Sequence, residues 1–182
     1  MSSANDKLIY TIGHSTRPLQ EFIQLLKSFN IKLVADIRSY PGSKRFPQYN
    51  KESLLQTLPE FGIEYKHFPG LGGRRKALKD SKNVGWKNDA FRGYADYMES
   101  GVFKIEVIRL EEIASQQATA YMCSEAVWWR CHRALLSDYL KSKGWIVLHI
   151  MAEHKAEEHP YTSPAKIVNG KLNYPGEHHM LF

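Results

Sequence analysis

Residues 123–133, CSEAVWWRCHR, hold both cysteines of the chain together with Glu125 and His132. A thiolate is a nucleophile and a metal ligand, and an adjacent imidazole or carboxylate can act as a general acid or base. We expect a helix to start near residue 124, directly after Cys123. Unpaired N–H groups at a helix N-terminus lower the pKa of a thiol. The segment therefore predicts Cys123 as a nucleophile or sulfur carrier and Cys131 as a partly buried, small apolar residue.

The spacing within this segment limits the kinds of thiol site that it can form. Cys123 and Arg130 are separated by six residues, which does not match the C-x5-R loop of phosphatases. A reversible Cys123–Cys131 bond lacks the CxxC spacing of oxidoreductases and needs Cα atoms within about 7 Å of each other. Zinc could be held by Cys123, Cys131 and His132, although there is no CxxC pair and no second ligand cluster. We expect no cofactor and keep a metal- or redox-sensing module as an alternative.

Ionisable side chains also follow two other short apolar runs. Asp36 and Arg38 alternate along one strand and share a face. Arg38 could bind a phosphate or carboxylate as a bidentate fork, with Asp36 orienting it. His14 follows the first apolar run, where the N–H groups that open the next helix would form an anion pocket. The other predicted substrate-binding residues are Ser15, Thr16, Arg17, Tyr40, Arg74, Arg75, Trp128 and Arg133.

The charge balance favours an anionic partner. Lys and Arg number 25 against 19 Asp and Glu, which gives a formal net charge of +6. The basic stretch at 69–93 also contains Trp86 and Phe91, and such a loop could follow a phosphate backbone and stack on bases. A solvated charged loop anchored by one aromatic residue explains the same pattern. No zinc finger or helix-turn-helix motif supports nucleic-acid binding.

Apolar runs with strand character alternate with segments of helical periodicity. The predicted strands are 7–13, 31–37, 63–68, 118–123 and 145–151. The predicted helices are 19–30, capped by Ser15 or Thr16, then 51–61, 94–115 with a break at Gly101, and 125–144. This order predicts an α/β fold: one three-layer domain over residues 1–165, with a mainly parallel, roughly five-stranded sheet flanked by helices. Residues 166–182 are expected to form a polar tail that packs loosely.

Three further patterns bear on the cellular setting. No apolar run reaches the roughly 18–20 residues that span a bilayer. The first ten residues lack the apolar stretch of a signal peptide, and two cysteines form no disulfide framework. We therefore expect a cytoplasmic protein without a membrane partner, and the sequence predicts no particular oligomeric state.

Four segments together resemble a known bacterial and archaeal family, the domain of unknown function 488. They are TIGHSTR at 11–17, VADIRSYPGS at 34–43, LGGRR at 71–75 and MCSEAVWWRCHR at 122–133. The resemblance runs from about residue 8 to residue 160 and implies a compact α/β domain, but no particular reaction. The residues that match its signature are His14, Arg17, Asp36, Arg38, Cys123, Glu125, Cys131, His132 and Arg133.

In an open α/β sheet, ligands bind beyond the carboxyl ends of the strands, where these side chains converge. The leading hypothesis is an enzyme that binds a phosphorylated or nucleotide-like anion at this edge. The predicted catalytic residues are His14, Asp36, Cys123, Glu125 and His132, with either histidine as the acid or base. A nucleic-acid-binding or nucleic-acid-processing protein is the main alternative.

Overall fold

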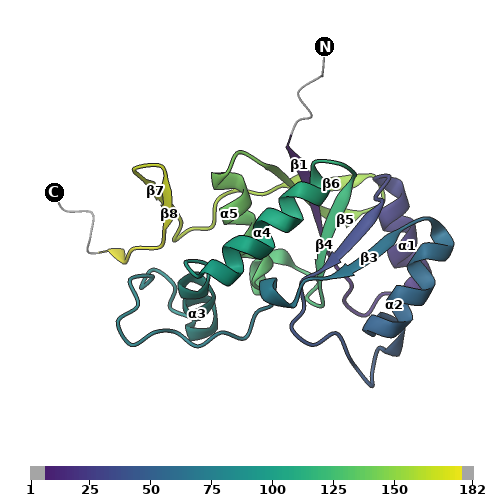
Figure 1. The fold of residues 1–182 in the computed structure, drawn as a ribbon, viewed down its shortest axis with the longest axis horizontal. Helices are drawn as coiled ribbons and strands as arrows, with labels where there is room; N and C mark the ends of the chain where they lie inside the picture. The colour runs from purple at the N-terminus through teal and green to yellow at the C-terminus, as the bar shows by residue number, and fades with distance from the viewer. Residues whose placement is uncertain (1–6, 178–182) are drawn as a thin grey trace, which may run out of the picture.

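The protein has one six-stranded sheet with helices on both faces (Figure 1). The structure is a computed structural model, and its described residues are 7–177. The strands are β1 (Leu8–Gly13), β2 (Leu33–Asp36), β3 (Glu64–His67), β4 (Thr119–Cys123), β5 (Ile146–Ala152) and β6 (Lys155–Glu158). Their order is β3-β2-β4-β1-β5-β6, and only β6 pairs antiparallel. The predicted three-layer α/β class is confirmed, with β6 added as a sixth strand.

Helices cover each face of the sheet and create two apolar cores. Side chains of α1 (Leu19–Ser28) and α2 (Lys51–Thr57) form one core, and those of α3 (Asp89–Tyr97), α4 (Gly101–Ala114) and α5 (Arg133–Ser142) form the other. Side chains alternate along a strand. Met122 accordingly joins the first core, and Cys123 joins the second. The last residue of β4 therefore points its side chain toward α5.

One predicted helix start and one predicted helix cap are wrong, for identifiable reasons. Helix α5 begins at Arg133 instead of near residue 124, and a loop with one 3-10 turn, Trp128–Arg130, precedes it. The carbonyls of Glu125 and Ala126 accept from the Arg133 side chain, so they are not available for helical hydrogen bonds. Helix α1 has Pro18 as its N-cap and no side-chain cap, so neither Ser15 nor Thr16 fills that role.

The predicted long loop is shorter than expected. Helix α3 begins at Asp89, inside the 69–93 stretch, because the Asn88 side chain accepts from the amides of Ala90 and Phe91. The break expected at Gly101 is present, since α3 ends at Tyr97 and α4 begins at Gly101. Short 3-10 turns occupy 47–49, 58–61 and 69–71.

The C-terminal segment forms a hairpin of β7 (Lys166–Val168) and β8 (Lys171–Asn173), apart from the main sheet (Figure 1). The hairpin is largely exposed, but Tyr174 is buried and donates its hydroxyl to Asp138 of α5 at 3.0 Å. One residue thus anchors the predicted tail. Residues 1–6 and 178–182, which include part of the N-terminal stretch and the tail end considered above, lie outside the described residues.

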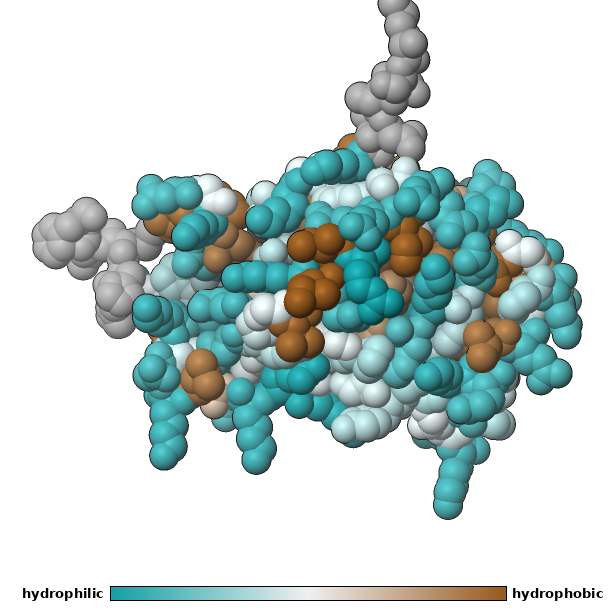
Figure 2. Space-filling view, viewed as in Figure 1, coloured by the Kyte–Doolittle hydropathy of each residue, from teal (hydrophilic) through white to brown (hydrophobic). Residues whose placement is uncertain are grey.

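Helix α4 is apolar on two sides. Phe103, Val107 and Leu110 are buried in the core. Val102, Ile105 and Ile108 are more than half exposed, and Figure 2 shows a hydrophobic band on the surface where α4 lies. Between residues 7 and 177, no helix is long and apolar enough to cross a membrane.

Candidate functional site

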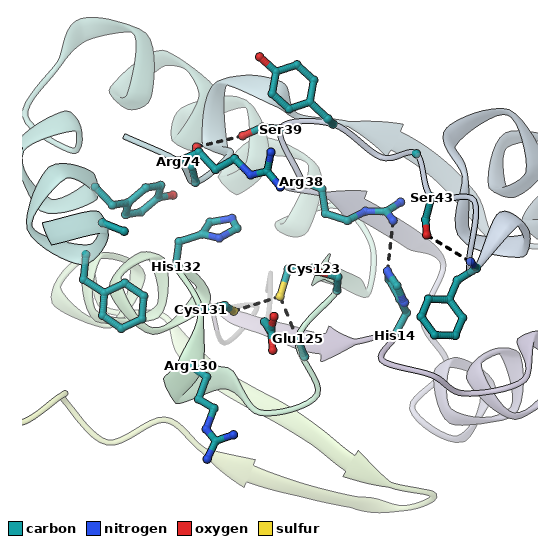
Figure 3. Close-up of a pocket in the computed structure, with 18 residues that line it drawn as sticks. His14, Arg38, Ser39, Ser43, Arg74, Cys123, Glu125, Arg130, Cys131 and His132 are labelled. Atoms are coloured by element: carbon teal, nitrogen blue, oxygen red, sulfur yellow. Dashed lines mark hydrogen bonds between the residues drawn. The ribbon is translucent and has the colours of Figure 1, made fainter. Parts of the chain in front are cut away.

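A cavity of about 450 Å³ opens at the carboxyl ends of β1, β2 and β4 (Figure 3). The edge predicted from strand order is therefore hollowed, as expected for an open α/β sheet. The predicted site residues that line it are His14, Arg38, Tyr40, Arg74, Cys123, Glu125 and His132, and Cys131 joins them. Residues from five separate segments thus meet in one place.

The two cysteines face each other in the wall of this cavity (Figure 3). Cys123 is 2% exposed and Cys131 is 7% exposed, and their Sγ atoms lie 3.0 Å apart without a bond between them. The backbone N and the Nε of Arg133 donate to the sulfur of Cys131, at 3.4 and 3.3 Å. Either thiol can be the donor between the two sulfurs, and each also has a long contact with a backbone carbonyl, Cys123 with that of Glu125 at 3.9 Å and Cys131 with that of Trp128 at 3.8 Å.

These contacts favour Cys131, and not Cys123, as the ionised cysteine of the pair. Burial raises the pKa of Cys131, but the hydrogen bond from Cys123 and the charge and hydrogen bonds of Arg133 outweigh it and lower this pKa to about 6. Burial and the neighbouring Cys131 raise the pKa of Cys123 well above its ordinary value. The helix expected to begin beside Cys123 begins at Arg133 instead, so the helix N-terminus that was expected to activate Cys123 is absent, and a reactive Cys123 stays a prediction.

Arg133 lies beneath the cavity and does not line it. It is 2% exposed, and besides Cys131 it donates to the hydroxyl of Thr11 and to the carbonyls of Glu125 and Ala126. Within residues 7–177, no carboxylate lies within ion-pair distance of its guanidinium. Its geometry fits the support of Cys131 better than the predicted contact with substrate.

A second arginine, partly buried, lines the other side of the cavity. Arg38 donates through Nε and Nη2 to the two carboxylate oxygens of Asp36, at 2.9 and 2.6 Å. Asp36 is 0% exposed and also accepts the Tyr65 hydroxyl at 2.5 Å. The remaining Nη1 of Arg38 donates to Nε2 of His14 at 3.2 Å. The Asp36 carboxylate is therefore enclosed, and it occupies the fork of Arg38 that was expected to bind a ligand; the predicted roles of both residues in a substrate site stay predictions.

His14 is held neutral with both ring nitrogens occupied. Its Nδ1–H donates to the Ser15 carbonyl at 2.9 Å, which leaves Nε2 to accept from Arg38. The ring stacks on Tyr49 with 4.1 Å between centroids, and burial lowers the pKa to about 4. In this arrangement His14 has no free nitrogen for proton transfer.

His132 is neutral as well but keeps one nitrogen free. Its Nε2–H donates to the Ile37 carbonyl at 3.0 Å, so Nδ1 is unprotonated and has no hydrogen-bond partner within residues 7–177. Burial lowers its pKa to about 4. Nδ1 faces Gly73, where a Cβ would approach to 3.0 Å. His132 thus presents a hydrogen-bond acceptor at the cavity.

The segment after β1 does not form the predicted anion pocket. The amides of His14 and Ser15 donate to the carbonyls of Cys123 and Ser124, at 3.0 and 2.9 Å. Arg17 turns to the Gly13 carbonyl and to the carboxylate of Glu21, and none of Ser15, Thr16 and Arg17 lines the cavity. These amides fasten β1 to the loop after β4, so they are not available to a ligand.

Two other predicted contacts also lie outside the cavity. The Arg75 guanidinium stacks on Tyr97 at 3.7 Å, and Trp128 stacks on His149 at 4.5 Å. Trp86, considered for base stacking, packs against Phe91 and Tyr174. Phe91, also considered for base stacking, does line the cavity, and so do residues to which the sequence assigned no role, among them Ser39, Ser43, Phe46 and Arg130. Their only sequence signal was proximity to a strand end or to the thiol segment, which is residues 123–133 with both cysteines.

A buried hydrogen-bonded chain behind Arg133 was not predicted. Arg133 donates to Thr11 at 3.1 Å, and Thr11 contacts Nδ1 of His149 at 2.7 Å. His149 Nε2 contacts Nδ1 of His159, and His159 Nε2 contacts Asp138, both at 2.9 Å. Burial, His159 and Arg133 lower the pKa of His149 to about 2, so it is neutral. With a donor at one end and a carboxylate at the other, every bond can point the same way.

Metal binding stays open as a prediction. Within residues 7–177, no group of three His, Cys, Asp or Glu side chains is arranged to hold a metal ion. Zinc bound by Cys123, Cys131 and His132 would need the His132 nitrogen that faces Gly73, because the other one donates to a carbonyl.

Comparison with known proteins gives one match. The family model described as "Domain of unknown function DUF488" matches residues 18–140, about two thirds of the chain. The matched range includes the Asp36–Arg38 pair and the whole thiol segment, and it ends before His149. No curated protein and no solved structure matches the chain.

Proposed function

This chain belongs to the DUF488 family, and we propose that it is an enzyme in which the Cys131 thiolate attacks an anionic substrate bound in the cavity. The observation that carries the proposal is the pair of N–H bonds from Arg133 to the Cys131 sulfur. The thiolate is the nucleophilic form of cysteine. A buried guanidinium aimed at sulfur favours that form at neutral pH.

The charges around the cavity favour an anionic substrate. Three arginines line it, and Glu125 is the one acidic side chain among its described lining residues. Asp36 neutralises Arg38, and Arg130 points away from the cysteine pair (Figure 3). Arg74 is exposed and has no ion-pair partner within residues 7–177, so its charge is free to meet a ligand. We assign the contact with the anion to Arg74.

Proton transfer falls to two side chains. The free Nδ1 of His132 can accept a proton or a hydrogen bond from the substrate. Glu125 is exposed at the cavity wall and has no ion-pair partner in the described part of the chain. We assign it the exchange of a proton with the leaving group. His14 is assigned to positioning Arg38, because both its nitrogens are occupied.

Alkylation of single-cysteine proteins tests the thiolate. Cys123→Ala leaves Cys131 as the sole thiol, and we expect its reaction rate to rise with pH around a midpoint well below the free-thiol value of about 8.5. The matched protein Cys131→Ala leaves Cys123, which is 2% exposed and should react more slowly. A midpoint at or above about 8.5 for Cys131 would overturn the proposal.

The anionic class is tested with the same Cys123→Ala protein and two reagents of similar size. The ratio of the iodoacetate rate to the iodoacetamide rate measures the preference of the site for an anion. Arg74→Gln should lower this ratio severalfold by removing a cation beside the entering carboxylate. Lys79→Gln, an exposed cation of the same loop that does not line the cavity, should leave it unchanged. Equal ratios in all three proteins would contradict an anion site.

A further inference from the structure

We propose that Cys123 and Cys131 form a dithiol pair that reduces an anionic disulfide, with Cys131 as the attacking sulfur and Cys123 as the resolving one. The inference rests on the proposed function for the Cys131 nucleophile and adds the reaction class. Its basis is the 3.0 Å separation of two unbonded sulfurs at the wall of a cavity (Figure 3).

The geometry allows a bond between the two sulfurs with little movement. A disulfide bond is about 2.05 Å long, so the sulfurs need to approach by about 1 Å. Cys123 is the last residue of β4 and is held in register with Gly13. Cys131 lies in the loop between the 3-10 turn and α5, where its amide donates to the Trp128 carbonyl at 3.4 Å and its carbonyl accepts from the Ala134 amide at 3.0 Å. The loop can therefore supply the movement while the strand stays in place.

Packing alone does not account for this arrangement. Two buried thiols could fill space as small apolar side chains. That role needs no cation, yet both the amide and the guanidinium of Arg133 are directed at the Cys131 sulfur. A nucleophile acting alone would need no second thiol. A second thiol 3.0 Å away would attack any intermediate in which Cys131 is bonded to a substrate sulfur. The pair therefore fits an exchange reaction in which the second thiol finishes what the first begins.

The two steps balance as thiol–disulfide exchange. The Cys131 thiolate attacks one sulfur of the substrate, the substrate S–S bond breaks, and the first half leaves as a thiolate. Cys123 then loses its proton to that thiolate or to water and attacks the Cys131 sulfur of the mixed disulfide. The second half of the substrate leaves as a thiolate, and the Cys123–Cys131 bond forms. Two electrons pass from the cysteines to the substrate, and a small-molecule or protein dithiol must reduce the pair again.

Arg133 is placed to assist both steps. Its charge acts on Cys123 as well as on Cys131 and favours the ionised form of each. Once Cys131 is bonded to the substrate, it no longer holds a negative charge beside Cys123. The same guanidinium then stabilises the thiolate of Cys123, which is the form that the second step requires.

Dithiobis(nitrobenzoate), an aromatic disulfide with two carboxylates, is the probe. We expect the wild-type protein to release two thionitrobenzoates per chain, to retain none, and to lose two hydrogens in intact mass. Cys123→Ser should release one and retain the other half as an adduct on Cys131. Cys131→Ser should react slowly. The neutral dithiodipyridine should react more slowly than the anionic probe with wild type, relative to the rates of both with a small thiol.

The outcomes separate this inference from the proposed function. Two retained adducts on wild type would overturn the dithiol pair and leave the Cys131 nucleophile standing. No adduct on Cys123→Ser would overturn both. Equal relative rates for the two probes would overturn the anionic class.

A redox titration of the unmodified protein against reduced and oxidised dithiothreitol needs no variant to fold. Reversible formation of the Cys123–Cys131 bond supports the pair, and its absence overturns it.

Discussion

Two guanidinium groups lie at the carboxyl edge of the sheet, buried Arg133 and partly buried Arg38, and they differ in the group that each one contacts. Arg38 forms a two-pronged pair with the carboxylate of Asp36. Arg133 has no carboxylate within ion-pair distance in the described part of the chain, and its Nε lies 3.3 Å from the sulfur of Cys131. One pair joins a guanidinium to a carboxylate, and the other joins a guanidinium to a thiol, a group that ordinarily ionises near pH 8.5.

The Asp36–Arg38 contact is an ion pair, whereas the charge that Arg133 meets depends on the protonation of Cys131. A buried charge is costly unless an opposite charge and hydrogen bonds accompany it. Asp36 meets that requirement for Arg38 whatever the ligand does. Arg133 obtains an opposite charge only if Cys131 loses its proton, so the burial of Arg133 and the ionisation of Cys131 favour each other. If the partner of Arg133 served stability alone, a carboxylate or an apolar side chain could replace Cys131.

The largest effect is expected where the fixed pair is broken. Arg38→Met leaves the fully buried Asp36 without its guanidinium, and should lower the free energy of unfolding by about 3–5 kcal/mol. Urea unfolding at neutral pH measures the loss. The double variant Asp36→Asn/Arg38→Met should recover part of it, because no isolated charge remains. A loss below about 1 kcal/mol would mean that the pair behaves like a surface ion pair and does not anchor the site.

A smaller loss of stability and a larger change in titration are expected from Arg133→Met. Cys131 can take up a proton when its partner is removed, so no buried charge is stranded. The remaining cost, about 2–3 kcal/mol, comes from the carbonyls of Glu125 and Ala126 and the hydroxyl of Thr11, which lose a donor. The pKa of Cys131 is about 6 with Cys123 present and should be higher in the Cys123→Ala protein, which lacks that hydrogen bond; Arg133→Met should raise it further, to at least the ordinary value near 8.5. Ultraviolet absorbance of the thiolate against pH, in the Cys123→Ala background, follows it.

The sign of the linked stability change gives a control for this variant. The pKa of Cys131 is lower in the folded chain, so its ionisation stabilises the fold fully above about pH 8.5. That contribution is lost as the pH falls through about 6. The stability difference between the Cys123→Ala protein and Cys123→Ala/Arg133→Met should therefore shrink as the pH falls from about 8.5 through the Cys131 midpoint of the Cys123→Ala protein. A difference that stays constant between these pH values would mean that Arg133 does not act through the Cys131 charge.

The layers of the fold could be predicted because their signals are local. Each parallel strand except β3 is a short apolar run, and the helices between them have periodic apolar faces. Strand β6 was missed, since its sequence KAEE is mostly charged and it lies at the edge of the sheet. Its formation depends on pairing with β5, a tertiary contact without an apolar pattern.

The composition of the site could also be predicted, but not the roles within it. Parallel strands bring their carboxyl ends together, so the convergence of Cys123, His132 and Arg38 followed from order alone. The identity of the thiolate depends on the direction of one side chain, Arg133, which spacing does not show. The same side chain occupies the carbonyls that a helix from residue 124 would have used. One tertiary contact therefore changed both the local structure and the chemistry.

The smallest effect is expected from Thr11→Val, which asks whether Arg133 is held only by its near partners. Thr11 is buried and links the guanidinium to His149, and valine keeps its shape without the hydroxyl. We expect a loss of about 1–2 kcal/mol from two unpaired polar groups, and a shift of the Cys131 midpoint by less than about one pH unit. Thr11→Ser keeps both hydrogen bonds and should match wild type. If Thr11→Val moves the midpoint as far as Arg133→Met does, the chain to Asp138 fixes the guanidinium. The thiolate would then depend on a network that spans the core, whereas the two groups of the Asp36–Arg38 pair bond each other directly.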